Sequence, residues 1–466
     1  MKRAAAVPTP RGFEATRRPP PRREPMGDAR AAAAWVVERT LASLAPADTF
    51  LADVIGRFED KDQGFLRELV LGTLRWLGRI DHVVAAASSR PLAQIEPALL
   101  APLRIAAYQL LFLDRVPAHA VVHEAVSQAA RVTHRGGASF TNAVLRRIAR
   151  SPELTDWPIT EGDEATRLAV ELSHPVFLVR RYLERLGPRA TRALLLANNQ
   201  PKPFHVMAFR DRGGRELLAE DLIDAGLEVE ASRVAPLGLV VRSGNPLTTP
   251  SFRRGDFYIQ DEAGQAAALV PPPRPGERVL DAAAAPGGKS LALLAFEPRV
   301  KLVAADISPA RLALLRQNLG RLRRQVPMLA ADAGAPALSG SFDRVILDLP
   351  CSGTGTFRKH PELKWRVSEG EIGRLAQLGQ RLLDGVADLV APEGLLIAVT
   401  CSLEREENED VIARFRERRS GFEPVALSEQ LGQPTVDWVR GEGLWRIPTA
   451  GDHDGFTVQA LRRVAP

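Results

Sequence analysis

The chain contains few cysteines, only two among 466 residues. An isolated pair in a chain without a secretion signal argues against a structural disulfide. No apolar run approaches the roughly 18 residues that a transmembrane helix needs, and the N-terminus has no apolar signal core. These absences predict a cytoplasmic protein that does not enter a membrane.

Outside its N-terminus the chain has almost no excess of either charge. The formal net charge is +6, but residues 1–25 carry seven Lys or Arg against two Glu, which leaves +1 for the rest. Overall charge therefore gives no argument for a nucleic-acid partner. Residues 1–27, rich in Pro, Arg and Ala, are predicted to be a disordered basic tail. A basic arm for RNA and a chain that starts at Met26 are the two alternatives for this tail.

The length of the chain predicts two or three domains. In residues 28–155 apolar side chains recur every three or four positions, which predicts an all-α domain. Residues 156–250 mix helical and strand-like stretches and predict a small α+β domain that links its neighbours or binds RNA. From residue 251 to 466 strands and helices alternate, which predicts an α/β domain with a mostly parallel sheet covered on both faces.

Both cysteines lie in short motifs that follow apolar, strand-like runs. Cys351 lies in Asp348-Leu-Pro-Cys-Ser-Gly-Thr-Gly355, and Cys401 lies in Thr400-Cys-Ser402. A cysteine that served only as a small buried side chain would not need Pro, Gly, Ser and Asp beside it. Two thiols near one pocket therefore indicate covalent catalysis.

A glycine turn joins the short apolar strand at residues 278–281 to a helix that begins near Gly288. Such a turn lets a ligand approach the backbone closely and presents free N–H groups to it. The end of the turn imitates a phosphate-binding loop, but that motif needs a glycine at position 283, where this chain has Ala. We therefore expect a cofactor at the turn formed by Ala283, Ala284, Ala285, Pro286, Gly287, Gly288 and Lys289.

Four aspartates follow successive apolar strands. Asp306 comes 25 positions after Asp281, where an acidic side chain can hold paired ribose hydroxyls. Asp332 is placed to accept a hydrogen bond from an adenine amino group, and Asp348 ends the fourth strand. Because such repetition is not typical of isolated turn or cap residues, we expect the four carboxylates to meet in one crevice.

Five short strings carry a specific resemblance to a known family. They are Asp281-Ala-Ala-Ala-Ala-Pro-Gly-Gly-Lys289, Asp306-Ile-Ser308, Asp348-Leu-Pro-Cys-Ser-Gly-Thr-Gly355, Lys359-His-Pro-Glu362 and Thr400-Cys-Ser402. They resemble the Sun/NOL1/NOP2 family of RNA cytosine 5-methyltransferases, and the resemblance extends from Asp28 to the end of the chain. Residues 116–126 and 139–147 are similar to the NusB-type helical RNA-binding domain. Two positions depart from the family pattern: Ala283 replaces a frequent cysteine and Leu349 a frequent alanine.

The resemblance implies a Rossmann-like methyltransferase domain that uses S-adenosyl-L-methionine and acts on RNA. Through the NusB-like domain it implies 16S ribosomal RNA as the substrate. It also implies that Cys401 is the nucleophile and that Cys351 assists breakdown of the adduct and product release. The chemistry of the residues alone does not assign these two roles. We expect no metal and no membrane partner, and we expect a monomer.

Asp348 and Lys289 are the other two candidate catalytic residues. A carboxylate at Asp348 can accept from the exocyclic amino group of cytosine and would reject the carbonyl of uracil. It could also lie close to the methyl end of the cofactor. Lys289 would hold the base or the nucleophile, although a solvated lysine in the first turn of a helix is an equal alternative.

Several basic residues are candidates for contact with RNA. Two segments near the site, Arg358-Lys359-His360 and Lys364-Trp365-Arg366, could touch phosphates and a stacked base. The alternative is a solvated loop anchored by Trp365. A weaker candidate patch consists of Arg146, Arg147 and Arg150. His119 and His123 lie one turn apart, but no Glu follows His119 as a metalloprotease would require, so we expect packing or surface roles.

Three other functions compete with 16S rRNA methylation. One is cytosine methylation of tRNA or another RNA. Another is a non-catalytic RNA-binding assembly factor, which would need neither thiol. The third is an N-methyltransferase on the same fold, which would need an Asp/Asn-Pro-Pro-Tyr-like loop where this chain has Asp348-Leu-Pro-Cys351.

Overall fold

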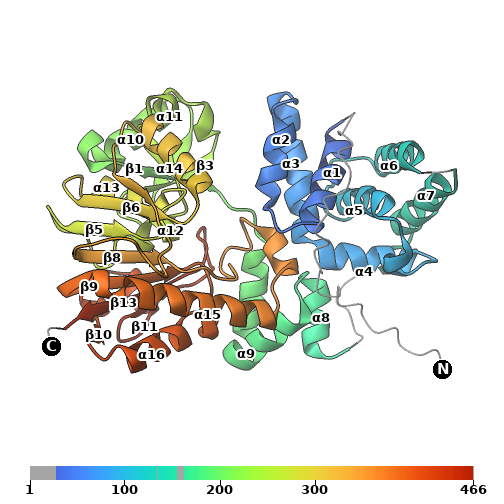
Figure 1. Ribbon diagram of the computed structural model, residues 1–466. Helices are drawn as coiled ribbons and strands as arrows, with labels where there is room; N and C mark the ends of the chain where they lie inside the picture. Colours follow the sequence, from blue (N-terminus) through green and yellow to red (C-terminus); the bar gives the residue numbers. More distant parts are fainter. Residues whose placement is uncertain (1–27, 134, 155–161, 465–466) are drawn as a thin grey trace. The chain divides into compact units, whose positions relative to one another are not determined.

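The computed structural model describes residues 28–133, 135–154 and 162–464. The predicted basic tail lies outside the described residues. The described chain forms two compact units. One consists of the chain up to Gln200 together with His360–Arg366, and the other consists of Pro201–Lys359 and the chain from Val367 onward. Figure 1 shows the elements of both units.

The first unit is helical in its described part, as the periodicity of the sequence predicts for residues 28–155. Its core contains aliphatic side chains such as Val37, Leu69, Val84 and Leu103, all fully buried. Its helices are α1 (Ala29–Leu41), α2 (Ala47–Ile55), α3 (Asp60–Arg75), α4 (Leu77–Ala87), α5 (Pro97–Phe112), α6 (Ala118–Val132), α7 (Arg135–Arg150), α8 (Glu164–Glu171) and α9 (Val176–Asn198), with short 3₁₀ turns η1 (Leu92–Gln94), η2 (Pro152–Leu154) and η5 (Pro361–Trp365).

Helix α9 changes direction in its middle. Pro188 cannot donate a backbone hydrogen bond and disfavours a helical conformation in the residue before it. That residue is Gly187, which takes φ of +76°, a conformation that costs glycine little. The chain therefore forms two helical segments in place of one straight helix.

The second unit contains a small antiparallel sheet with the order β2-β3-β1-β4. Its strands are β1 (Phe204–Ala208), β2 (Glu228–Ala231), β3 (Gly238–Ser243) and β4 (Phe257–Ile259). The helices α10 (Gly214–Asp224) and α11 (Pro250–Arg254) and the 3₁₀ turns η3 (Arg210–Arg212) and η4 (Pro246–Thr248) accompany them. Leu218 and Leu222 of α10 pack on Val206 and Phe257 of the sheet, which confirms the small α+β fold.

The large sheet has nine strands with the order β11-β12-β13-β9-β8-β5-β6-β7, and β10 pairs with β13. Its strands are β5 (Arg278–Asp281), β6 (Lys301–Asp306), β7 (Met328–Ala330), β8 (Phe342–Asp348), β9 (Val390–Thr400), β10 (Phe422–Pro424), β11 (Val439–Gly441), β12 (Leu444–Ile447) and β13 (Phe456–Arg463). Its helices are α12 (Glu262–Ala267), α13 (Gly288–Phe296), α14 (Pro309–Arg321), α15 (Glu369–Val386) and α16 (Glu409–Arg418), with 3₁₀ turns η6 (Ala387–Leu389), η7 (Arg405–Glu407), η8 (Leu427–Glu429) and η9 (Thr435–Trp438).

The expectation of a mostly parallel sheet is only half right. Strands β5 to β9 are parallel, but the pairs that β13 makes with β9, β10 and β12, and the pair β11 with β12, are antiparallel. A parallel connection needs a crossover of about a dozen residues or more. Residues 448–455 between β12 and β13 are too few for one, so β13 returns antiparallel to β12, and the sheet is mixed.

Helices cover both faces of the parallel strands, as expected. Along β8, Val345 and Leu347 belong to one hydrophobic cluster and Ile346 to the other, because successive side chains of a strand point to opposite faces. Leucines of α13 and α14 fill the first cluster with Ile346. Side chains of α15 and α16, such as Leu383 and Phe415, fill the second. The central strands are therefore buried on both sides.

Candidate active site

The parallel strands bring their carboxyl ends to one edge of the large sheet. Strand β5 ends at Asp281, β6 at Asp306, β8 at Asp348 and β9 at Thr400. Asp281 lies in register with Ile346, and Asp348 with Val399. In a parallel α/β sheet this edge is where ligands bind. The four aspartates and both cysteines of the sequence analysis belong to loops or strand ends at this edge.

The two cysteines meet at the ends of β8 and β9. Cys351 Sγ and Cys401 Sγ lie 3.5 Å apart, both thiols are free, and both residues are partly exposed. The backbone joins the two loops as well, because Gly355 N donates to Cys401 O at 2.9 Å. The hydrogen bond to Cys401, burial, and the negative charges of Glu407 and Asp348 raise the pKa of Cys351 well above its usual range. Either sulfur can donate to the other across this contact, so each thiol can act on the other.

Lys289 forms an ion pair beside the cysteines. Its Nζ lies 2.5 Å from Asp348 Oδ2 and 5.6 Å from the centre of the Phe456 ring. Burial alone would lower the pKa of Lys289, but the charge of Asp348, with a further contribution from Cys401, raises it above the usual value. Lys289 is thus a buried ammonium and not the solvated side chain of the alternative, while the Asp348 side chain stays 38% exposed.

The glycine turn lies between β5 and α13. Gly287 takes φ of +119° just before the helix, a conformation that L side chains rarely adopt, and a Cβ on Gly288 would come 2.9 Å from Gln260 Nε2. The first N–H groups of α13 have no partner within the helix. Ala283 and Gly288 are partly exposed and Pro286 is exposed, while Ala284, Ala285 and Gly287 are buried. A ligand at this turn would therefore meet backbone, as expected.

Asp281 is the most deeply buried of the four aspartates. Its Oδ2 accepts from Ser290 Oγ at 2.6 Å, whereas its Oδ1 has no hydrogen-bond partner among the described residues. Burial raises the pKa of Asp281 to about 6, although Ser290 and the charge of Lys289 oppose the shift. An unpartnered carboxylate oxygen in the interior costs stability, so it marks a place where a ligand group can donate.

Asp306 and Asp332 complete the edge on the side of β6 and β7. Asp306 is buried and accepts from the backbone N–H groups of Ser308 at 2.9 Å and Ala285 at 3.2 Å. Asp332 follows β7 and accepts from Gly334 N at 2.8 Å and from Arg381 at 2.9 Å, and these bonds lower its pKa. A carboxylate offers about four acceptor positions. Both aspartates keep acceptor capacity for ligand hydroxyl or amino groups.

These residues fit a nucleoside-type cofactor that carries amino, carboxylate and hydroxyl groups. The unpartnered Oδ1 of Asp281 can accept from an ammonium group. The free N–H groups at Gly287 and Gly288 suit a carboxylate, and Asp306 and Asp332 suit hydroxyl and amino donors. These acceptors and N–H donors therefore agree with S-adenosyl-L-methionine. No group of three or more His, Cys, Asp or Glu that could hold a metal ion occurs in the described part of the chain.

The expected RNA contacts of the segment Lys364-Trp365-Arg366 are wrong. Lys364 is fully buried in the helical unit, where Nζ donates to Arg75 O, Ser173 O and Asn199 Oδ1 at 2.7 to 3.0 Å. Trp365 Nε1 donates to Leu74 O at 2.8 Å. The guanidinium of Arg366 donates to three backbone carbonyls of residues 40–45. The segment is an anchor built into the helical unit, and it is not a solvated loop.

The other basic candidates divide into buried and exposed residues. Arg358 is buried and donates to Gly451 O and Pro201 O, so its charge is not available to a phosphate. Lys359 is exposed. The remaining patch residues Arg146, Arg147 and Arg150 are exposed on α7, and His119 and His123 are exposed on α6. His360 is partly exposed, and its Nδ1 lies 3.7 Å from Glu362 Oε1. RNA contact by His360 and by the exposed residues stays a prediction.

Sequence reasoning missed a polar network beneath the cysteines. Glu407 is buried and accepts from both Ser352 N and Ser352 Oγ, each at 2.7 Å. Asn408 accepts from Thr400 Oγ1 at 2.6 Å and donates to Ser402 O and Glu404 O. A run of charged residues after Cys401 is typical of a solvated turn. Nothing in the sequence pattern indicated burial.

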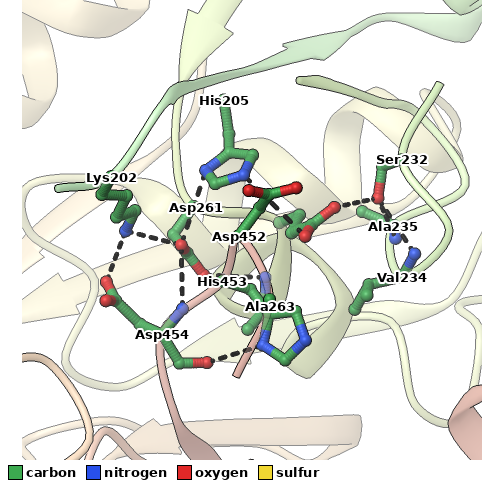
Figure 2. A network of polar contacts seen from close by, with 12 residues as sticks. Lys202, His205, Ser232, Val234, Ala235, Asp261, Ala263, Asp452, His453 and Asp454 are labelled. Carbon is green, nitrogen blue, oxygen red and sulfur yellow. Dashed lines mark hydrogen bonds and ion pairs between the residues drawn. The ribbon is translucent and has the colours of Figure 1, made fainter. Parts of the chain in front are cut away.

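A second missed network supports the loop 451–455 (Figure 2). Lys202 Nζ lies 2.5 Å from carboxylate oxygens of both Asp261 and Asp454, and Asp261 also accepts from Asp454 N at 3.2 Å. The neighbouring Gly455 donates its N–H to Gly355 O at 2.7 Å. A side chain at Gly355 would collide with Gly455 O, so the two glycines allow the backbone of this loop to approach that of the Cys351 loop.

Comparison with known proteins gives matches along nearly the whole described chain. Residues 268–462 match the family model for 16S rRNA methyltransferase RsmB/F, residues 28–150 the NusB family, and residues 174–248 the ferredoxin-like domain of RsmF/B-like methyltransferases. The ribosomal RNA small subunit methyltransferase B of Pseudomonas syringae pv. tomato is 34% identical over 94% of this chain and 97% of its own length. A probable protein of the same name from Bacillus subtilis is 31% identical over 87% and 91%.

Solved structures agree with these matches. The crystal structure of PH0851 covers 93% of this chain and 99% of its own at a TM-score of 0.78 and 27% identity. The NSun6 structure from Pyrococcus horikoshii has a TM-score of 0.55 over 62% of this chain at 20% identity, which supports the fold alone. Fold and site together define a methyltransferase with a NusB-like helical domain and a ferredoxin-like domain. The chain belongs to the 16S rRNA methyltransferase RsmB/F family.

No helix in the described residues is long and apolar enough to cross a membrane.

Proposed function

We propose that this protein transfers a methyl group from S-adenosyl-L-methionine to carbon 5 of a cytosine in small-subunit ribosomal RNA, through a covalent adduct with Cys401. The observation that carries the proposal is the contact of two free cysteines at 3.5 Å beside the ion pair of Lys289 and Asp348. The names of the relatives from Pseudomonas syringae and Bacillus subtilis support ribosomal RNA as the substrate.

Carbon 5 of cytosine is a poor nucleophile in the aromatic ring. Addition of the Cys401 thiolate to carbon 6 would form a sulfur–carbon bond and make carbon 5 enamine-like. The ammonium of Lys289 is placed to stabilise the thiolate by charge before the addition. Asp348 would accept a hydrogen bond from the exocyclic amino group of the base, which distinguishes cytosine from uracil. The bound cofactor supplies the electrophilic methyl group.

Release of the product requires transfer of the carbon 5 proton to solvent water, formation of the carbon 5–carbon 6 double bond from the freed electron pair, and cleavage of the bond between Cys401 and carbon 6. The departing sulfur takes the electron pair of that bond and becomes a thiolate again. Cys351 is a thiol within hydrogen-bonding distance of this sulfur, so it can donate to the thiolate as it forms. The family resemblance supports Cys401 as the nucleophile and Cys351 as the group that assists release, and their 3.5 Å separation allows one sulfur to act on the other.

The target base has to leave its stack before Cys401 can reach carbon 6. Asp281, Asp306, Asp332 and the turn from Ala283 to Lys289 would hold the cofactor at the sheet edge. The cysteines occupy the ends of β8 and β9 on the same edge. Base and cofactor would therefore meet beside the Lys289–Asp348 pair.

The test is transfer of a labelled methyl group to unmodified small-subunit ribosomal RNA, with the product nucleoside identified by mass spectrometry. We expect 5-methylcytosine from the wild type, none from Cys401→Ala, and protein linked to RNA from Cys351→Ala. Transfer to tRNA in place of ribosomal RNA would overturn the substrate. Methyl groups on an exocyclic nitrogen, or full activity of Cys401→Ala, would overturn the chemistry.

A further inference from the structure

Glu407 lies behind the cysteine pair and has no role in the mechanism above. It ends the 3₁₀ turn η7, six positions after Cys401, and the residue is only 2% exposed. Both of its carboxylate oxygens accept from one residue, Ser352, which directly follows Cys351. The backbone N–H reaches Oε1 and the hydroxyl reaches Oε2, each at 2.7 Å. One side chain of the Cys401 loop thus holds the Cys351 loop at two points.

The loop that carries Glu407 is itself fixed. Asn408 bonds Thr400 Oγ1, Ser402 O and Glu404 O, which ties the residues after Cys401 to the end of β9. Ser402 Oγ lies 3.4 Å from Ser352 Oγ and 3.3 Å from Thr354 Oγ1. Several bonds thus join the two cysteine loops, including the one from Gly355 N to Cys401 O. The two bonds that Ser352 donates to Glu407 are the ones made by the residue next to Cys351.

A buried carboxylate is a costly way to hold a loop. Burial raises the pKa of Glu407 to about 7, although the bonds from Ser402 and Ser352 oppose the shift. Its negative charge also contributes to the raised pKa of Cys351. Ionisable groups whose pKa is strongly shifted next to reactive residues occur preferentially at functional sites. The position of Glu407 beside Ser352 and Cys351 therefore points to a role at the site.

We propose that Glu407 is the positioning residue that holds Cys351 against Cys401 and thereby sets the rate at which methylated RNA is released. The inference rests on the proposed function, because it assigns the step that Glu407 serves. It requires that loss of the two bonds leaves the addition of Cys401 intact and slows the breakdown of the adduct. A residue needed only for folding would affect both steps alike.

The experiment compares Glu407→Ala, Glu407→Gln and Ser352→Ala with the wild type and with Cys351→Ala. Glu417→Ala, which removes an exposed carboxylate of α16, is the matched control. Single-turnover methyl transfer to ribosomal RNA measures the chemical step. The amount of protein linked to RNA on a denaturing gel, and its decay after a chase with unlabelled RNA, measures release.

We expect Glu407→Ala to form the adduct within about threefold of the wild-type rate and to release RNA at least about tenfold more slowly. Glu407→Gln can still accept from Ser352 N and donate to Ser352 Oγ, so it should restore release to within about threefold. Ser352→Ala loses one of the two bonds, so its release rate should lie between those of Glu407→Ala and Glu407→Gln. Ser352→Ala also decides the question if Glu407→Ala does not fold. Glu417→Ala should behave as the wild type.

Two results separate failure of this inference from failure of the proposed function. If Cys351→Ala accumulates linked RNA while Ser352→Ala and the Glu407 variants release it at the wild-type rate, Glu407 does not position Cys351. Equal loss of adduct formation and release in Glu407→Ala and Ser352→Ala would also overturn the inference. If Cys351→Ala forms no linked RNA and Cys401→Ala keeps full activity, the proposed covalent route itself is wrong.

Discussion

Lys289 and Lys364 are both buried lysines, but they lie in different units and their surroundings differ. Lys289 faces the carboxylate of Asp348 at the strand-end edge, beside the thiol of Cys401. Lys364 lies in the helical unit, where three oxygen atoms accept from it. Burial and the charge of Arg75 lower the pKa of Lys364, whereas the pKa of Lys289 is raised.

The difference shows what makes a buried charge chemically useful. The oxygens around Lys364 use all three donors of its ammonium, so nothing is left for a ligand. Lys289 pairs with a carboxylate that stays partly exposed, and its charge also reaches Cys401. The first arrangement uses the charge to close a fold, and the second leaves a charge beside the proposed nucleophile. Variants of these residues and their neighbours can test this contrast.

The largest effect is expected for Cys401→Ala. Without the thiolate, carbon 5 of cytosine is not activated, so methyl transfer should fall by at least about a thousandfold. Labelled methyl transfer under single-turnover conditions measures the loss. Activity within tenfold of the wild type would remove Cys401 from the covalent step.

The second largest effect is expected for Lys289→Met. It removes the charge beside Cys401 and leaves Asp348 unpaired, so adduct formation should slow by about a hundredfold, the scale seen when one electrostatic donor is lost. The rate of adduct formation with RNA in rapid-quench experiments checks this. Lys364→Met is the matched control, because it removes a buried lysine that belongs to the other unit. Equal slowing by both variants would contradict the contrast.

Lys364→Met should instead destabilise the helical unit. It leaves Arg75 O, Ser173 O and Asn199 Oδ1 without their donor, and we expect the free energy of unfolding to fall by about 2 to 4 kcal/mol. Denaturant unfolding followed by circular dichroism measures the change. A stability equal to the wild type would mean that water or a rearranged side chain replaces the ammonium.

Asp281→Asn should change stability less than Lys364→Met does. It should raise the free energy of unfolding, whereas Lys364→Met should lower it. The folded protein keeps a proton on Asp281 up to pH about 6, whereas the unfolded chain loses it near the ordinary value of about 3.9. The free energy of unfolding therefore falls as the pH rises between these values. At pH 8 the variant should be about 1 to 2 kcal/mol more stable than the wild type, and the two should converge near pH 4.

The same variant should bind S-adenosyl-L-methionine about tenfold more weakly, because it replaces the unpartnered carboxylate oxygen by an amide. Isothermal titration calorimetry of the two proteins, with unfolding measured from pH 4 to 8, gives both quantities. A variant that gains no stability above pH 6, or that keeps the full affinity, would show that Asp281 is not held ready for a ligand.

The sequence predicted the fold class, because apolar periodicity distinguishes the helical unit from the alternating strands and helices. It did not predict the antiparallel strands β10 to β13, since short apolar runs look alike in either direction. The strand-end aspartates and the cysteine motifs were found because each follows a strand. The sequence analysis assigned Lys364 to RNA contact and did not single out Glu407. A charged residue in a polar run gives no sign of whether other residues bury it.

The most direct measurement uses ribosomal RNA in which cytosines carry fluorine at carbon 5, so that the adduct cannot lose a proton and break down. The wild-type protein is incubated with this RNA and S-adenosyl-L-methionine, and the linked peptide is identified by mass spectrometry. We predict a stable adduct on the peptide that contains Cys401, also formed by Cys351→Ala. An adduct on Cys351, or none with an RNA that is otherwise methylated, would contradict the account.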